Sequence, residues 1–98
     1  MVSMDKLKDK NVDQIFEGIL QLRTVEECYA FCEDLCTVRE IKSMAQRFAV
    51  AKMLTEKRVY SDIVNETGAS TATISRVNRS LGYGNDGYAL VFGRMQEK

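Results

Sequence analysis

The segment from Tyr60 to Leu81 constrains the fold of this 98-residue chain more than any other feature, because one glycine separates two short apolar patterns. Apolar residues recur at helical spacing on both sides of that glycine: Ile63, Val64, Ile74, Val77 and Leu81. Gly68 can adopt the positive φ of a sharp turn, and Ala69 is small enough to lie beneath it. Ser70 has the side chain of a helix N-cap. The pattern predicts two short helices joined by a tight turn.

The outer face of the second predicted helix is small and polar near its start and basic further on. It consists of Thr71, Ala72, Thr73, Ser75, Arg76 and Arg79. Such a face suits a major groove about 12 Å wide, with Thr71, Ala72 and Ser75 at base edges and Arg76 or Arg79 at a guanine or phosphate. The spacing therefore predicts a DNA-binding helix-turn-helix from about residue 60 to 81. The alternative is an ordinary helical hairpin with a solvated Ser/Thr-rich face.

One position fits this motif poorly. Val64 stands where such motifs usually hold Ala or Gly, so we expect an unusual distance or angle between the two helices.

The rest of the chain also predicts helices joined by short turns, because it contains no proline. Apolar residues from Val12 to Leu22 define a first helix, and Thr24 and Thr37 each begin a capping box that opens a further helix. The helix after Thr37 is long and apolar as far as Leu54. A glycine-rich turn over residues 82–87 precedes a last short helix, for which Asn85 or Asp86 is the candidate N-cap. We expect an all-α fold with residues 1–98 in a single helical domain.

The charges are distributed unevenly although the formal net charge is zero. Residues 1–36 hold eight acidic and four basic side chains, and residues 39–58 hold six basic and two acidic ones. An acidic half and a basic half indicate a face that meets a polyanion. A solvated helix of mixed charge is the alternative explanation.

Three cysteines, Cys28, Cys32 and Cys36, recur every four residues and so share one face of the second predicted helix. They alternate with apolar residues, which predicts buried small hydrophobic side chains; a thiol sensor is the alternative. The chain has no histidine, and one helix face disposes thiolates poorly around a metal, so we expect no metal site. Neither a cofactor loop nor a catalytic constellation is apparent, and we expect no cofactor and no enzymatic activity.

The amino-terminal residues hold five charged side chains and no apolar core of a signal peptide, which predicts a cytoplasmic protein. No apolar run is long enough to span a membrane, so we expect no membrane partner. Phe31 lies off the apolar stripe of its helix, and the long third helix is apolar around more than half its girth. This surplus favours a homodimer. A third helix buried in the middle of a monomer is the alternative.

Residues 69–81 resemble the recognition helix of the Trp repressor family, and the whole chain resembles its YerC/YecD-like branch. The similarity covers about residues 10–85, including the long helix that ends in Met53 and Leu54, and is most specific from Gly68 to Leu81. It implies an intertwined helical homodimer that places two recognition helices in successive major grooves of double-stranded DNA.

The resemblance also identifies the positions of the family's corepressor site. Arg76 matches an arginine that contacts tryptophan, but Val77 stands where the family has a glycine that leaves room for the indole. Gln46 stands where a second arginine contacts the ligand, although Arg47 is one residue away. We therefore expect no tight binding of tryptophan.

These observations together predict a homodimeric, sequence-specific transcriptional regulator, most simply a repressor that does not respond to tryptophan. One alternative keeps the same helical fold but docks on another protein without binding DNA. A regulator controlled by an unknown small molecule is a further possibility. Tyr83 and Tyr88 are expected to pack on the partner or on the first helix, or else to border a ligand pocket.

Overall fold

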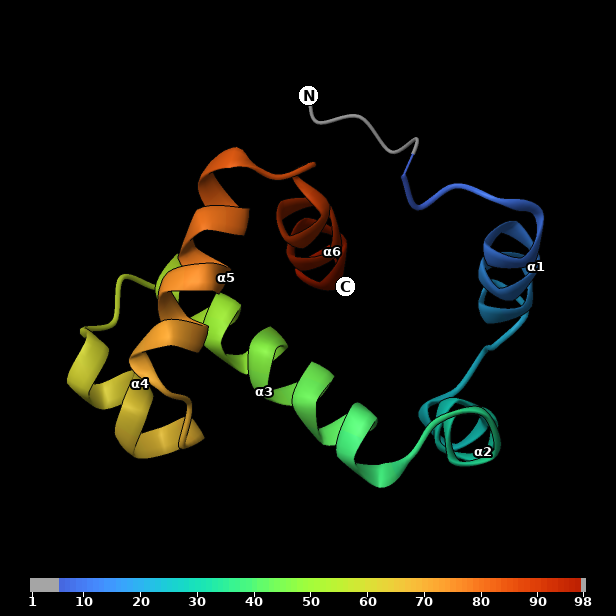
Figure 1. Cartoon of the computed structure of the whole chain (residues 1–98), viewed down its shortest axis with the longest axis horizontal. Coiled ribbons are helices and arrows are strands. Elements are labelled where there is room, and N and C mark those ends of the chain that lie inside the picture. The colour runs from blue at the N-terminus through green and yellow to red at the C-terminus, as the bar shows by residue number, and fades with distance from the viewer. Residues whose placement is uncertain (1–5, 98) are drawn as a thin grey trace. The chain divides into compact units, whose positions relative to one another are not determined.

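The computed structural model of the chain describes residues 6–97, and every regular element in this range is a helix (Figure 1). This confirms the all-α class. The six helices are α1 (Lys10–Ile19), α2 (Val25–Leu35), α3 (Val38–Thr55), α4 (Tyr60–Thr67), α5 (Thr71–Tyr83) and α6 (Gly87–Met95). The described residues form two compact units that divide within α3, between Ile41 and Lys42.

Side chains from just before each helix fix the start of the first three helices. The α3 capping box is complete: the Glu40 N–H donates to Thr37 Oγ1 at 3.1 Å, and the Thr37 N–H donates to Glu40 Oε1 at 2.8 Å. At α2 the Glu27 N–H donates to Thr24 Oγ1, but the carboxylate accepts from the Arg23 N–H, one residue earlier than expected. Both predicted helix starts are confirmed. At α1 the cap is Asp9, whose Oδ1 accepts from Val12 N at 2.8 Å.

The first helix is shorter than its apolar pattern predicted. It ends at Ile19, because the N–H groups of Gln21 and Leu22 donate to carbonyls three residues back instead of four. Leu22 therefore lies in the connection to α2.

The amino-terminal unit, described from residue 6 to residue 41, buries none of its side chains in this single chain. Its exposed large hydrophobic residues are Leu7, Phe16, Ile19, Leu20, Val25, Tyr29, Leu35 and Val38. Cys28 is exposed, and Cys32 and Cys36 are only half-buried. The expected burial of the cysteines is therefore wrong for the chain alone, because nothing in this unit covers that face of α2. Across residues 6–97, no helix has both the length and the apolar character needed to cross a membrane.

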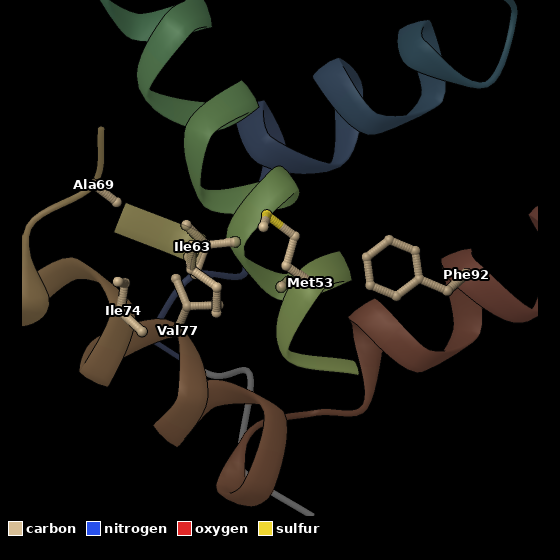
Figure 2. Packing of buried hydrophobic residues seen from close by; sticks show 8 residues of the cluster. Met53, Ile63, Ala69, Ile74, Val77 and Phe92 are labelled. Atoms are coloured by element: carbon tan, nitrogen blue, oxygen red, sulfur yellow. The ribbon is translucent and has the colours of Figure 1, made fainter. Parts of the chain in front are cut away.

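The hydrophobic core lies in the carboxy-terminal unit, where α3, α4, α5 and α6 each contribute (Figure 2). It is formed by Val50, Ala51, Met53, Ile63, Ala69, Ile74, Val77 and Phe92. Three aromatic rings extend it: Phe48 of α3 lies 4.9 Å from Phe92 and 6.3 Å from Tyr88, measured between ring centroids. The predicted last helix therefore packs on α3 of its own chain through Tyr88 and Phe92, a contact that the sequence pattern did not indicate.

The carboxyl end of α3 is a Schellman motif. The Arg58 N–H donates to the Met53 carbonyl and the Lys57 N–H to the Leu54 carbonyl, each at 3.0 Å. Lys57 takes the left-handed conformation that this motif requires, with φ at 64°. The motif turns the chain sharply from the scaffold helix into α4.

Candidate nucleic-acid interface

The turn between α4 and α5 has the geometry that the sequence predicted. Gly68 has a φ of 71°, and its N–H donates to the Val64 carbonyl at 2.9 Å, which closes α4. Ala69 is almost fully buried beneath the turn. The Thr67 hydroxyl donates to the Ile63 carbonyl and accepts from the Ala69 N–H, which holds the turn from its inner side.

Ser70 caps α5, as expected. Its Oγ accepts from the Thr73 N–H at 3.1 Å and donates to Thr73 Oγ1 at the same distance. The half-buried Thr73 side chain is therefore part of the cap, whereas the sequence placed it on the outer face with Thr71 and Ala72. A hydroxyl at the third position of a helix is a signal that could have indicated this role.

The inner face of α5 packs against the hydrophobic core and so fixes the position of this helix. Ile74 and Val77 are at most 2% exposed and lie in the core with Ile63 of α4. Val64 is half-buried and packs against the same core, and the unusual distance or angle between α4 and α5 expected from its size stays a prediction. Because the side chains of Ile74 and Val77 are buried in the core, the opposite face of α5 must point away from the core, toward solvent.

The outer face of α5 is exposed over the whole helix. Four of its residues follow the spacing i, i+4, i+7 and i+11 and so share one stripe: Ala72, Arg76, Arg79 and Tyr83. Thr71 and Ser75 flank the stripe and are also exposed. Within the described residues, neither guanidinium of the stripe takes part in an ion pair. The face thus offers two uncompensated positive charges among short polar side chains.

Tyr83 is the member of this stripe that sequence reasoning placed elsewhere. Its side chain is 81% exposed at the last position of α5, and the spacing of four residues from Arg79 was the signal available. Tyr83 borders a hollow of about 550 Å³ between α5 and the end of α3, and Tyr88 borders a separate hollow of about 520 Å³ beside Phe48.

Arg58 forms ion pairs with two acidic side chains of α4. Its Nε lies 3.7 Å from Asp62 Oδ2, and its Nη2 donates to Glu66 Oε2. The hydrogen bond with Glu66 raises the pKa of the guanidinium. Arg58 lies in the connection between α3 and α4, whose path the sequence pattern does not give. The pairing reduces the negative charge that α4 would present to a polyanion.

The positions that the resemblance assigned to a ligand have other contacts. Gln46 Nε2 donates to the Thr67 carbonyl at 3.1 Å, which ties α3 to the end of α4. Arg47 Nη1 donates to Ser43 Oγ on its own helix at 3.1 Å. Val77 lies in the core, and Arg76 is exposed.

Cys36, at the end of α2, is not an activated thiol. Partial burial, with smaller effects from Cys32 and Glu40, raises the pKa of the Cys36 thiol, which keeps it protonated and a poor nucleophile. In the part of the chain that the structure describes, no group of three or more cysteine, aspartate or glutamate side chains is arranged to hold a metal ion.

Comparison with known proteins assigns this geometry to one family. The sequence profile of the Trp repressor protein family matches residues 10–96. The protein YerC of Bacillus subtilis strain 168, described as uncharacterized, is 55% identical over 96 residues, covering 98% of this chain and 92% of YerC. The crystal structure of a TrpR-like protein from Eubacterium eligens superposes with a TM-score of 0.90 at 61% identity, over 94% of this chain and 95% of that one. A candidate Trp repressor from Staphylococcus aureus gives 0.92 at 49% identity, over 100% and 98% of the two chains.

Proposed function

Because the chain belongs to the Trp repressor family, we propose that it is a homodimeric, sequence-specific DNA-binding regulator of transcription rather than an enzyme. It would act in the cytoplasm, as a repressor. The outer face of α5 is the observation that carries this proposal. Short side chains at Thr71, Ala72 and Ser75 allow a close approach to base edges, and Arg76 and Arg79 are free to bind a guanine or a phosphate.

The core supports the proposal because it makes the recognition face rigid. A base-reading helix must hold its direction, and α5 is held by Ile74 and Val77 on one side and capped by Ser70 at its start. Gln46 adds a hydrogen bond from the scaffold to the end of α4. The DNA-binding face therefore has little freedom to reorient.

The second subunit is inferred from the amino-terminal unit. Leu20 is 80% exposed, Val38 69% and Val25 66%, although side chains of this kind bury readily in a stable protein. A second copy of the chain that covers these residues would supply the missing core and pair two recognition helices. Sedimentation equilibrium at micromolar concentration tests this, and a monomer would contradict it.

The DNA-binding proposal is tested by selecting bound sequences from a random duplex pool with the purified full chain. A two-fold symmetric motif with half-sites about one helical turn apart is the expected result. The variants Arg76→Ala and Arg79→Ala should bind the selected duplex more weakly while keeping the helical content and the dimer. Wild-type affinity in both variants would contradict the assigned face.

A protein-docking module is the second candidate, favoured by the same exposed apolar side chains and by the formal net charge of zero. Salt dependence separates the two functions. A regulator that neutralises several phosphates loses affinity for duplex DNA steeply as salt rises, whereas a docking module shows no duplex binding to titrate.

We propose further that tryptophan does not control the protein. The isopropyl group of Val77 fills space that a glycine would leave open, and Gln46 offers a neutral amide that already donates to the Thr67 carbonyl. The carboxylate of a bound tryptophan would thus have only Arg76 as a cationic partner. Its indole ring would find the space beside residue 77 occupied by the valine side chain. Calorimetry with L-tryptophan should give no heat of binding, and micromolar affinity would overturn this proposal. Control by some other small molecule would appear as a ligand-dependent change in DNA affinity.

A further inference from the structure

We propose that the hollow beside the carboxyl end of α5, lined by Lys57, Asn78 and Tyr83, binds a phosphate of the DNA backbone at the edge of the major groove. The inference rests on the proposed DNA-binding function. It adds a second contact surface, which shares Tyr83 with the exposed stripe of α5 and otherwise involves side chains that the helix-turn-helix pattern does not identify.

Three kinds of hydrogen-bond donor line the hollow. Lys57 supplies an ammonium group, Asn78 an amide and Tyr83 a phenol hydroxyl, and each of these can donate to a phosphate oxygen. Leu54 and Leu81 form the apolar part of the lining. A phosphate bound there would lose some of its water, which strengthens its attraction to the ammonium group.

These donors are not used elsewhere in the described part of the chain. The ion pairs found among residues 6–97 are those of Lys8 with Asp13 and of Arg58 with Asp62 and Glu66, so Lys57 has no carboxylate partner there. Arg58, the next residue, already holds the two acidic side chains of α4.

The nearest acidic side chain in sequence also lies outside the hollow. Glu56 lines a different one, between the end of α3 and α6. The hollow therefore has a net positive lining.

The length of α5 places this hollow beyond the groove. From Ala72 to Tyr83 the helix advances by about 16.5 Å, whereas the major groove is about 12 Å wide. In helix-turn-helix complexes the start of the recognition helix contacts the base edges, so the end of α5 passes the groove rim, where the backbone phosphates lie. Asn78 projects about 100° around the helix from Arg79, on the side that Lys57 approaches.

The test compares Lys57→Gln with Lys52→Gln in the full-length protein. Both variants remove one exposed lysine charge. Lys52, however, lines the hollow beside α6 and is not part of the proposed phosphate site. Glutamine keeps a side chain at the left-handed position, so the fold of the α3 end is preserved. Duplex affinity is measured between about 50 and 200 mM salt on the selected site and on an unrelated duplex.

Lys57→Gln should reduce the slope of log affinity against log salt by about one for each subunit, and it should weaken both duplexes equally because phosphates carry no sequence information. Lys52→Gln should leave the slope unchanged. Tyr83→Phe, which removes only the hydroxyl, should lower the affinity about two- to tenfold per subunit.

Three outcomes would contradict the proposal that the hollow binds a DNA phosphate. A wild-type slope in Lys57→Gln refutes it while leaving the DNA-binding function intact. Thermal stabilisation of the wild type by millimolar inorganic phosphate, lost in Lys57→Gln without a change of slope, assigns the hollow to a free anion. Absence of duplex binding by the wild type at the lowest salt concentration refutes both the phosphate site and the proposed DNA-binding function.

Discussion

Replacing Lys57 by glycine should stabilise the protein, because this residue is held in a conformation that a Cβ atom disfavours. Its φ is 64°, and the Schellman hydrogen bonds at the end of α3 fix it there. The left-handed conformation costs a residue other than glycine about 1–2 kcal/mol. Glycine avoids this cost in the folded state, but it also makes the unfolded chain more flexible, which stabilises the unfolded state by about 0.4–1 kcal/mol. We expect a net gain of about 0.5–1 kcal/mol in the free energy of unfolding.

The assay is thermal and urea unfolding followed by circular dichroism, at one fixed protein concentration because the stability of a dimer depends on it. The gain corresponds to a rise in Tm of about 2–8 °C for a domain of this size. Lys52→Gly is the matched control: the same exchange inside α3 should destabilise by about 1 kcal/mol. If Lys57→Gly unfolds at or below the wild-type temperature, the left-handed strain is not there to relieve. The same variant should bind duplex DNA more weakly, so stability and affinity should change in opposite directions.

Other substitutions test the motif and its electrostatics. Gly68→Ala places a Cβ at a φ of 71° and should destabilise by about 0.5–1 kcal/mol in urea unfolding, after the same unfolded-chain term as at Lys57; an unchanged midpoint would contradict the turn geometry. Ile74→Ala should cost about 2–5 kcal/mol and Ile74→Val about 0.5–1.5, because the side chain is fully buried, and equal effects of the two would argue against a packed core. Arg58→Met should lower duplex affinity by freeing its two carboxylate partners, and neutralising those carboxylates as well should restore it; no rescue would mean that Arg58 acts through the fold alone. Hydrogen bonds from Thr37 lower the pKa of Glu40 from its ordinary value of 4.5, so its contribution to stability is present at neutral pH and is lost as the pH falls through the lowered pKa. The stability difference between the wild type and Glu40→Gln should therefore shrink in acid, and a difference independent of pH would contradict this.

The helix-turn-helix was predictable because its signals are local. Gly68 determines the turn through its own backbone freedom, and Ser70 caps the helix that starts beside it. Ile74 and Val77 identify the buried face by spacing alone, since one face of a helix must be apolar to pack. The resemblance of this segment to the Trp repressor family is confirmed for nearly the whole chain.

Long-range contacts were not predictable in the same way. Arg58 reaches carboxylates four and eight residues further on, and Gln46 donates to a carbonyl 21 residues away. Both contacts depend on the angle at which the chain leaves α3. That angle is set by the left-handed Lys57, a residue type that carries no sequence signal for this conformation.

The apolar stripes of α1 and α2 show a second limit of prediction from the sequence. Their spacing indicated amphipathic helices, and those helices are present, but no side chain of the unit from residue 6 to residue 41 is buried within one chain. Periodicity identifies a face that needs covering and does not say what covers it. The expected burial of Cys28 failed for this reason.

The outer face of α5 remains the feature with the most direct bearing on function. By itself the sequence determined the helices, the caps at Thr24, Thr37 and Ser70, and the turn at Gly68, because each depends on residues within one or two turns. Only the tertiary structure decided that Thr73 belongs to the cap, that Arg58 pairs with the carboxylates of α4, and that Tyr83 and Lys57 line the same hollow. Those arrangements depend on how helices meet in space, which the order of residues specifies only through the folded core.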